Sequence, residues 1–176
     1  VSKKVTIKAN KVVITLNLIK NLFSQEYNQL SQADKALLEA YFGNDPEGLT
    51  GYRGKWMAIV EALFNESKAG KNIEPTDYDP ATGLSGLVAA IKRFLEGTKD
   101  EQGKTLEMGF IEFYNTYVID DNANRTQPAQ LVNGQPPAGF IYIKWDAVGK
   151  KWTVKANKVV ITLNLIKNLF SQEYNQ

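Results

Sequence analysis

Two segments of the chain, residues 8–29 and residues 155–176, share one sequence, KANKVVITLNLIKNLFSQEYNQ. The match extends upstream with three differences, so a first copy (residues 1–29) and a second copy (residues 148–176) lie 147 positions apart. The differences are Ser2/Gly149, Val5/Trp152 and Ile7/Val154. Self-similarity at a fixed spacing is the mark of repeat architectures. Because drift scatters changes along natural repeats, the unbroken identical run indicates recent duplication or deliberate engineering.

The duplicated segment combines two hydrophobic patterns. Val5 and Ile7 alternate with polar residues, and a second apolar run follows a polar turn, which predicts two short strands. The second apolar run is Val12, Val13, Ile14 and Leu16. From Leu16 onward the spacing changes to that of one helix face, with Ile19, Leu22, Phe23 and Tyr27. Thr15 or Asn17 is the predicted N-cap of this helix, which is expected to end near Asn28. Each copy is therefore predicted to be a strand–turn–strand–helix unit.

Three further helices are predicted in the middle of the chain. Ser31 and Asp34 resemble a capping box, and Gly43 supplies the stop of the helix that they begin. The next helix has a predicted buried face formed by Tyr52, Trp56, Ile59, Val60 and Leu63. Residues 68–84 are predicted to be a loop, and a further helix is expected from Ser85 to a cap at Gly97.

The last third of the chain predicts a mixture of elements. Residues 105–120 have helical spacing but a strand-like composition, and we favour a helix. Residues 121–139 read as an extended surface connection, and residues 140–145 read as a strand that turns into the second copy. The predicted fold class is therefore α+β: four to five helices packed on a small, mainly antiparallel sheet, with the duplicated segment at both termini. We expect residues 1–147 to form one repeat unit, with residues 148–176 swapped or paired with a neighbour.

Composition excludes several classes of function. The 176 residues carry 21 basic and 19 acidic side chains in mixed order, without the basic stripe that nucleic acid binding requires. The chain has no Cys and no His, which excludes Ser-His-Asp and Cys-His catalysis and histidine-ligated metals. No apolar run approaches the roughly 20 residues of a membrane span. We therefore expect no enzymatic activity, no cofactor and no nucleic acid partner.

Two groups of residues are candidate binding sites. Asp77, Tyr78 and Asp79 place two carboxylates beside an aromatic ring in a long loop, and Trp145 and Trp152 are candidates for a carbohydrate platform. A ligand-binding domain, most plausibly for a carbohydrate, is thus the alternative function. An enzyme that uses Asp77 and Asp79 ranks third.

The run from Asp120 to Asn124 has the oxygen spacing that begins a calcium loop. Arg125 replaces the required Gly, and Leu131 replaces the bidentate Glu. This run is therefore interpreted as a polar turn, without a metal.

The duplication itself suggests the leading hypothesis. If a unit has one place for the segment, two copies compete for it, and the copy left over has apolar surface to bury. A fragment of a tandem array, an engineered two-frame switch and a donor-strand arrangement all fit, as does a larger domain with two pseudo-symmetric edges. We favour a non-enzymatic structural or interaction module whose partner is itself, as a homo-oligomer or a neighbouring repeat. Trp152 marks the preferred copy, because only one environment will accept its indole.

Overall fold

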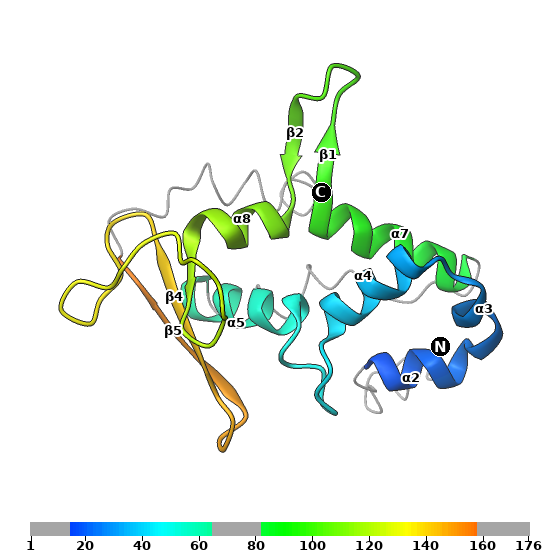
Figure 1. Cartoon of the computed structure of the whole chain (residues 1–176), viewed down its shortest axis with the longest axis horizontal. Coiled ribbons are helices and arrows are strands. Elements are labelled where there is room, and N and C mark those ends of the chain that lie inside the picture. Colours follow the sequence, from blue (N-terminus) through cyan, green and yellow to red (C-terminus); the bar gives the residue numbers. More distant parts are fainter. Residues whose placement is uncertain (1–14, 65–81, 158–176) are drawn as a thin grey trace, which may run out of the picture.

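The computed structural model describes residues 15–64 and 82–157, which form helices and two small sheets (Figure 1). The helices are α2 (Leu16–Leu22), α3 (Ser24–Gln29), α4 (Gln32–Phe42), α5 (Tyr52–Phe64), α7 (Gly83–Glu96) and α8 (Phe110–Tyr117). The strands are β1 (Gly97–Lys99), β2 (Thr105–Met108), β3 (Val118–Asp120), β4 (Ile141–Asp146) and β5 (Lys151–Ala156). The predicted α+β class is confirmed.

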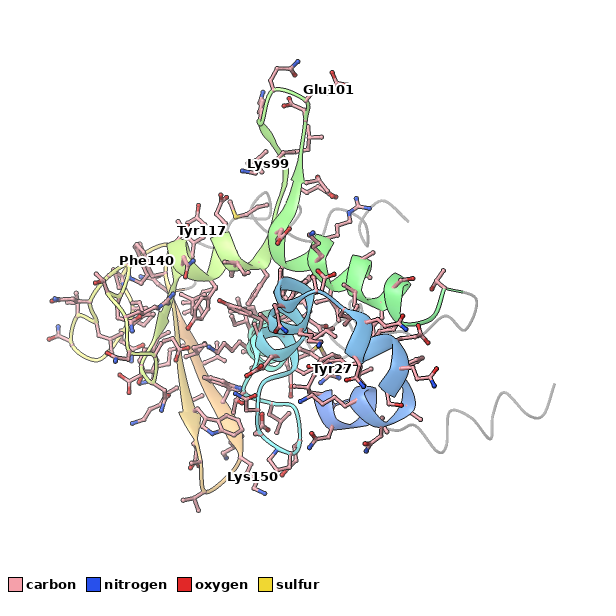
Figure 2. The ribbon with its side chains drawn as sticks, turned by 45° about the vertical axis from the view of Figure 1, so that its right-hand side comes forward. Tyr27, Lys99, Glu101, Tyr117, Phe140 and Lys150 are labelled. Carbon is pink, nitrogen blue, oxygen red and sulfur yellow. The ribbon has the colours of Figure 1, made fainter. Side chains whose placement is uncertain are left out.

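The strands form two sheets, whereas the sequence predicted one. β1 and β2 are an antiparallel hairpin that projects from the helices, with Lys99 and Glu101 near its tip (Figure 2). The other sheet has the order β3-β4-β5, with β3 parallel to β4 and β5 antiparallel to β4. The parallel pair is possible because α8 ends directly at β3, and the long connection over residues 121–140 then returns the chain to β4.

The first copy begins its described part with a capped helix. The Thr15 hydroxyl accepts a hydrogen bond from the Leu18 N–H at 3.2 Å, which confirms one of the two predicted caps. The single predicted helix is divided at Phe23, whose backbone leaves the helical region at φ −123°. Leu16 belongs to α2 and not to the second predicted strand, and Leu22 is 66% exposed instead of buried. The strand part of the first copy lies outside the described residues.

The capped helix after Ser31 has its predicted bounds. The Ser31 hydroxyl accepts a hydrogen bond from the Asp34 N–H at 3.1 Å. At the other end Gly43 has φ +79°, and a Cβ there would lie 2.5 Å from the Gly51 nitrogen. Only glycine fits this close turn without strain.

The segment over residues 105–120 is a helix only in its middle. Residues 105–108 form β2, residues 110–117 form α8, and residues 118–120 form the fully buried strand β3. The preference for a single helix was therefore wrong at both ends. α7 also begins two residues before the predicted Ser85, at Gly83.

The core is a continuous cluster of apolar side chains drawn from α2, α4, α5, α7, α8, β3 and β4. Trp56 on α5 is 1% exposed, and its ring lies 5.1 Å from Phe94 and 5.8 Å from Phe110. The sequence-based assignment of Trp56 to the core is thus confirmed. None of the helices in the described part of the chain has the length and apolar character to cross a membrane.

Candidate functional site

The second copy supplies the outer strand of the β4–β5 hairpin. The predicted strand over residues 140–145 is confirmed as β4, and β5 pairs with it from Ile141 opposite Ala156 to Asp146 opposite Lys151. We call the place of β5 beside β4 the strand position. β5 thus packs in the same body as residues 15–64 and 82–147, although it belongs to the second copy.

The first copy supplies the helices at the other end of the molecule. α2 and α3, both from the first copy, lie on the side away from β4 and β5 (Figure 1). We call their place the helix position. The first copy's equivalent of β5 is residues 4–9, and the second copy's equivalent of α2 and α3 is residues 163–176. Both segments lie outside the described residues. The described body therefore combines the strand of one copy with the helices of the other.

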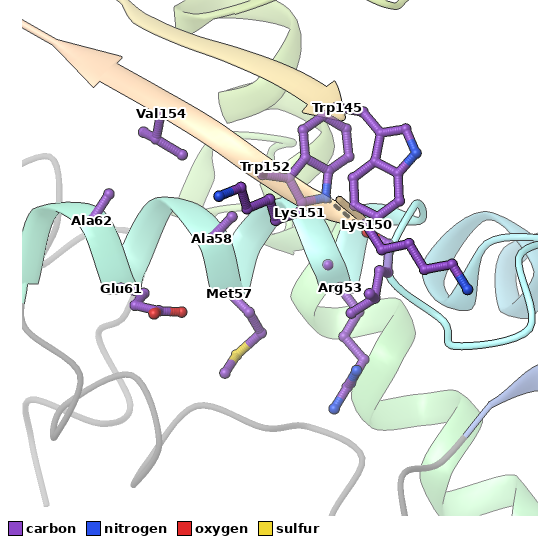
Figure 3. Close-up of a pocket in the computed structure, with 12 residues that line it drawn as sticks. Arg53, Met57, Ala58, Glu61, Ala62, Trp145, Lys150, Lys151, Trp152 and Val154 are labelled. Carbon is purple, nitrogen blue, oxygen red and sulfur yellow. Dashed lines mark hydrogen bonds between the residues drawn. The ribbon is translucent and has the colours of Figure 1, made fainter. Parts of the chain in front are cut away.

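Trp152 connects β5 to the loop between α4 and α5. Its Nε1–H donates a hydrogen bond to the Leu49 carbonyl at 2.8 Å, and its ring lies 5.2 Å from the Trp145 ring (Figure 3). The Asp45 carboxylate holds the Leu49 loop by accepting hydrogen bonds from the backbone of Leu49 and Thr50 and from the Thr50 hydroxyl. Burial alone would raise the pKa of Asp45, but these hydrogen bonds outweigh it and lower that pKa.

Lys55, Tyr114 and Asp120 form a polar cluster next to the Trp152 ring. Lys55 Nζ is 3.0 Å from Asp120 Oδ2 and 3.1 Å from Tyr114 Oη, and its distance from the Trp152 ring centroid is 5.8 Å. The Tyr114 hydroxyl donates to Asp120 Oδ2 at 2.5 Å. Burial, followed by this hydrogen bond and the Asp120 charge, raises the pKa of Tyr114 far above its usual value. Tyr114 therefore stays neutral and acts as a hydrogen-bond donor.

The loop after Asp120 is held by its own side chains. Gln127 accepts a hydrogen bond from the Asp120 N–H at 3.0 Å and donates one to the Asp120 carbonyl at 2.7 Å. The Arg125 guanidinium lies 3.9 Å from the Tyr114 ring centroid and donates to the Val118 carbonyl. Asp120 is thus an anchor between Lys55 and Tyr114 within a polar turn. Among the described residues no group of three or more acidic side chains could hold a metal ion.

A groove of about 530 Å³ runs between α5 and β5 (Figure 3). Its lining includes two of the three tryptophans, three cationic side chains and one acidic side chain: Trp145, Trp152, Arg53, Lys150, Lys151 and Glu61. Lys150 Nζ pairs with Glu47 at 2.8 Å, which raises the pKa of Lys150. The structure brings the two predicted tryptophans together, while Asp77, Tyr78 and Asp79 lie outside the described residues.

Comparison of the chain with protein-family models, curated protein sequences and solved structures finds no match. The function must therefore follow from the residues of the chain itself. The strand position and the helix position are the most specific features of the chain, because two segments of the sequence match each of them.

Proposed function

We propose that the chain is a non-enzymatic structural module that associates with further copies of itself through its duplicated segment. One observation carries the proposal: a single body takes its strand from the second copy and its helices from the first copy. The segments left over, residues 4–9 and residues 163–176, match those already used. Each can fill the corresponding position in a neighbouring unit.

The helix position is defined by two buried side chains of α2 and one side-chain hydrogen bond from α3. Leu16 is 7% exposed and Ile19 is 1% exposed, and both belong to the core. Burying one such side chain stabilises by about 1.5–3 kcal/mol. Glu26 on α3 also accepts a hydrogen bond from the Leu84 N–H at 3.2 Å, at the N-terminus of α7, where Thr82 makes no side-chain cap. Residues 163–176 carry the same side chains.

The short connection to residues 163–176 favours a neighbour as their acceptor. Only residues 158–162 separate the described part of the second copy from residue 163, and five residues span at most about 18 Å. The helix position lies at the other end of the described body (Figure 1), and in every molecule α2 and α3 fill it, so the incoming segment replaces the acceptor's own α2 and α3. Donation to the next molecule gives a head-to-tail contact, which runs on as a filament or closes as a ring.

Light scattering across a range of protein concentrations tests the proposal. The full chain is expected to show a molar mass that rises above the monomer with concentration, and a chain that lacks residues 158–176 is expected to stay monomeric. A full chain that is strictly monomeric, with the same stability as the shortened chain, would remove the proposal.

The groove between α5 and β5 favours a second candidate function, the binding of a carbohydrate. Trp145 and Trp152 both line this groove, with ring centroids 5.2 Å apart and ring planes inclined by 52°, so they present two aromatic surfaces to it. The three cationic side chains outnumber the carboxylates even when Glu47, the ion-pair partner of Lys150, is counted with Glu61, which favours an acidic sugar. Calorimetry with uronic acid oligosaccharides, on the wild-type chain and on Trp145→Ala, tests this function. Equal heats from the two proteins would count against it.

A further inference from the structure

The differences between the two copies fall on the residues that contact the rest of the body. In β5 the half-buried side chains are Trp152, Val154 and Ala156, and the exposed ones are Lys151, Thr153 and Lys155. The first copy has Val5 and Ile7 where the second has Trp152 and Val154. On the exposed face the first copy has the same three residues as the second. The copies therefore differ on the face that packs against α5 and agree on the face toward solvent.

The third difference lies in the turn that leads into β5. A Cβ at Gly149 would lie 2.5 Å from Asp146 Oδ2. The Asp146 side chain accepts a hydrogen bond from the Val148 N–H at 3.0 Å through its other oxygen. A serine, as at Ser2 of the first copy, would force the Asp146 carboxylate to move. The second copy thus carries the residue that leaves the Asp146 carboxylate in its place in this turn.

Val5 would lose several contacts in place of Trp152. It has no donor for the Leu49 carbonyl, which accepts the indole N–H at 2.8 Å. It also has no ring to contact Trp145 or Lys55. The loss of this partly buried hydrogen bond and of the ring contacts is destabilising, so the first copy fits the strand position less well.

We propose that the strand position selects the second copy, whereas the helix position accepts either copy equally. This inference rests on the proposed function and specifies which segment stays in its own molecule and which one is donated. Each molecule keeps its own β5, and its residues 163–176 exchange with α2 and α3 at the helix position of the next molecule. The helical parts are identical in the two copies, so only the strand part discriminates. The partner is a second molecule of this chain, bound through helices.

Cysteine cross-linking can read which copy fills the strand position, because the chain has no native cysteine. Lys144 is the register partner of Thr153, and both are exposed. Thr6 is the equivalent of Thr153 in the first copy. The reporters are therefore Lys144→Cys with Thr153→Cys, and Lys144→Cys with Thr6→Cys. Gel mobility separates links within one chain from links between chains.

The expected yield of the Thr153 reporter is about tenfold that of the Thr6 reporter. Making the strand of the first copy equal to that of the second, by Val5→Trp and Ile7→Val, should raise the Thr6 yield severalfold without changing any described residue. Trp152→Val should raise it as well. Equal yields from the two reporters, or a Thr6 yield that Val5→Trp and Ile7→Val leave unchanged, would overturn the selection.

The outcomes separate this inference from the proposed function. Discrimination between the reporters in a chain that stays monomeric would support the selection and remove the assembly. Equal yields from the two reporters in a chain that associates would support the assembly and remove the selection of the second copy at the strand position.

Discussion

At the residue scale, Trp152 joins three parts of the molecule. It is a member of β5, it donates a hydrogen bond to the loop between α4 and α5, and its ring contacts Trp145 on β4. A single side chain therefore couples the strand position to the helices. Its replacement separates the contribution of the hydrogen bond from that of the ring.

We expect Trp152→Phe to lower the free energy of unfolding by about 1 kcal/mol, because the Leu49 carbonyl loses its donor. Trp152→Ala should lower it by about 2–3 kcal/mol, since the ring contacts are lost too. Urea unfolding at a fixed, low protein concentration measures both. Val148, which is 95% exposed, provides the control, and Val148→Ala should change the stability by less than about 0.5 kcal/mol. A Trp152→Phe chain as stable as the wild type would contradict the role of the hydrogen bond.

The buried tyrosine makes stability depend on alkaline pH. Burial raises the pKa of Tyr114 above its usual 10.0, so the folded chain holds this proton more tightly than the unfolded chain. The resulting stabilisation is fully present below pH 10 and is lost as the pH rises through the folded-state pKa. Tyr114→Phe should cost about 2 kcal/mol at neutral pH, and this difference should narrow above pH 10. Urea midpoints from about pH 7 to about pH 11 measure it, and a constant difference would contradict the assignment.

Local patterns predicted some of these residues and missed others. The caps at Thr15 and Ser31 were predictable because each bonds to a backbone N–H three positions away. The contact of Lys55 with Tyr114 joins residues 59 positions apart, so no local spacing indicates it. Asp120 was predicted to begin a polar turn, but it is the last residue of β3 and the turn follows it; its burial depends on α5 and α8 packing together.

At the element scale, helical spacing was the most reliable guide. It predicted α4 and α5 because each presents a regular apolar face and α4 has a cap at both ends. It failed over residues 105–120, where β2 pairs with the hairpin strand β1 and β3 pairs with β4. Those pairings depend on partners elsewhere in the chain and override the local helical preference.

The complementation of α2 by the second copy can be tested at this scale. Ile19→Asp should lower the stability of a chain that lacks residues 158–176 by about 4 kcal/mol, because it buries a carboxylate in the core. In the full chain at high concentration the loss should be about 1 kcal/mol, since residues 163–176 of a neighbour can fill the helix position. Thermal unfolding of the four chains measures the coupling. Equal losses in the two backgrounds would show that the second copy does not replace the first.

At the scale of the whole molecule, the described body has a strand position and a helix position, and the sequence contains two segments that match each of them. The strand position is filled from the second copy and the helix position from the first, at opposite ends of the structure (Figure 1). In the assembly that we propose, such a body has one donor end and one acceptor end. Its contacts with neighbours are therefore expected to be head-to-tail, and its assemblies polar.

The most direct test of this account compares two substitutions in the second copy. Ile166 and Leu169 correspond to Ile19, which is 1% exposed in α2, and to Leu22, which is 66% exposed. Both variants add the same charge to the same segment, so only the contact with the helix position distinguishes them. Light scattering at matched concentrations should find Ile166→Asp monomeric, and Leu169→Asp as associated as the wild type. Association of Ile166→Asp to the wild-type extent would contradict the binding of residues 163–176 at the helix position of a neighbour.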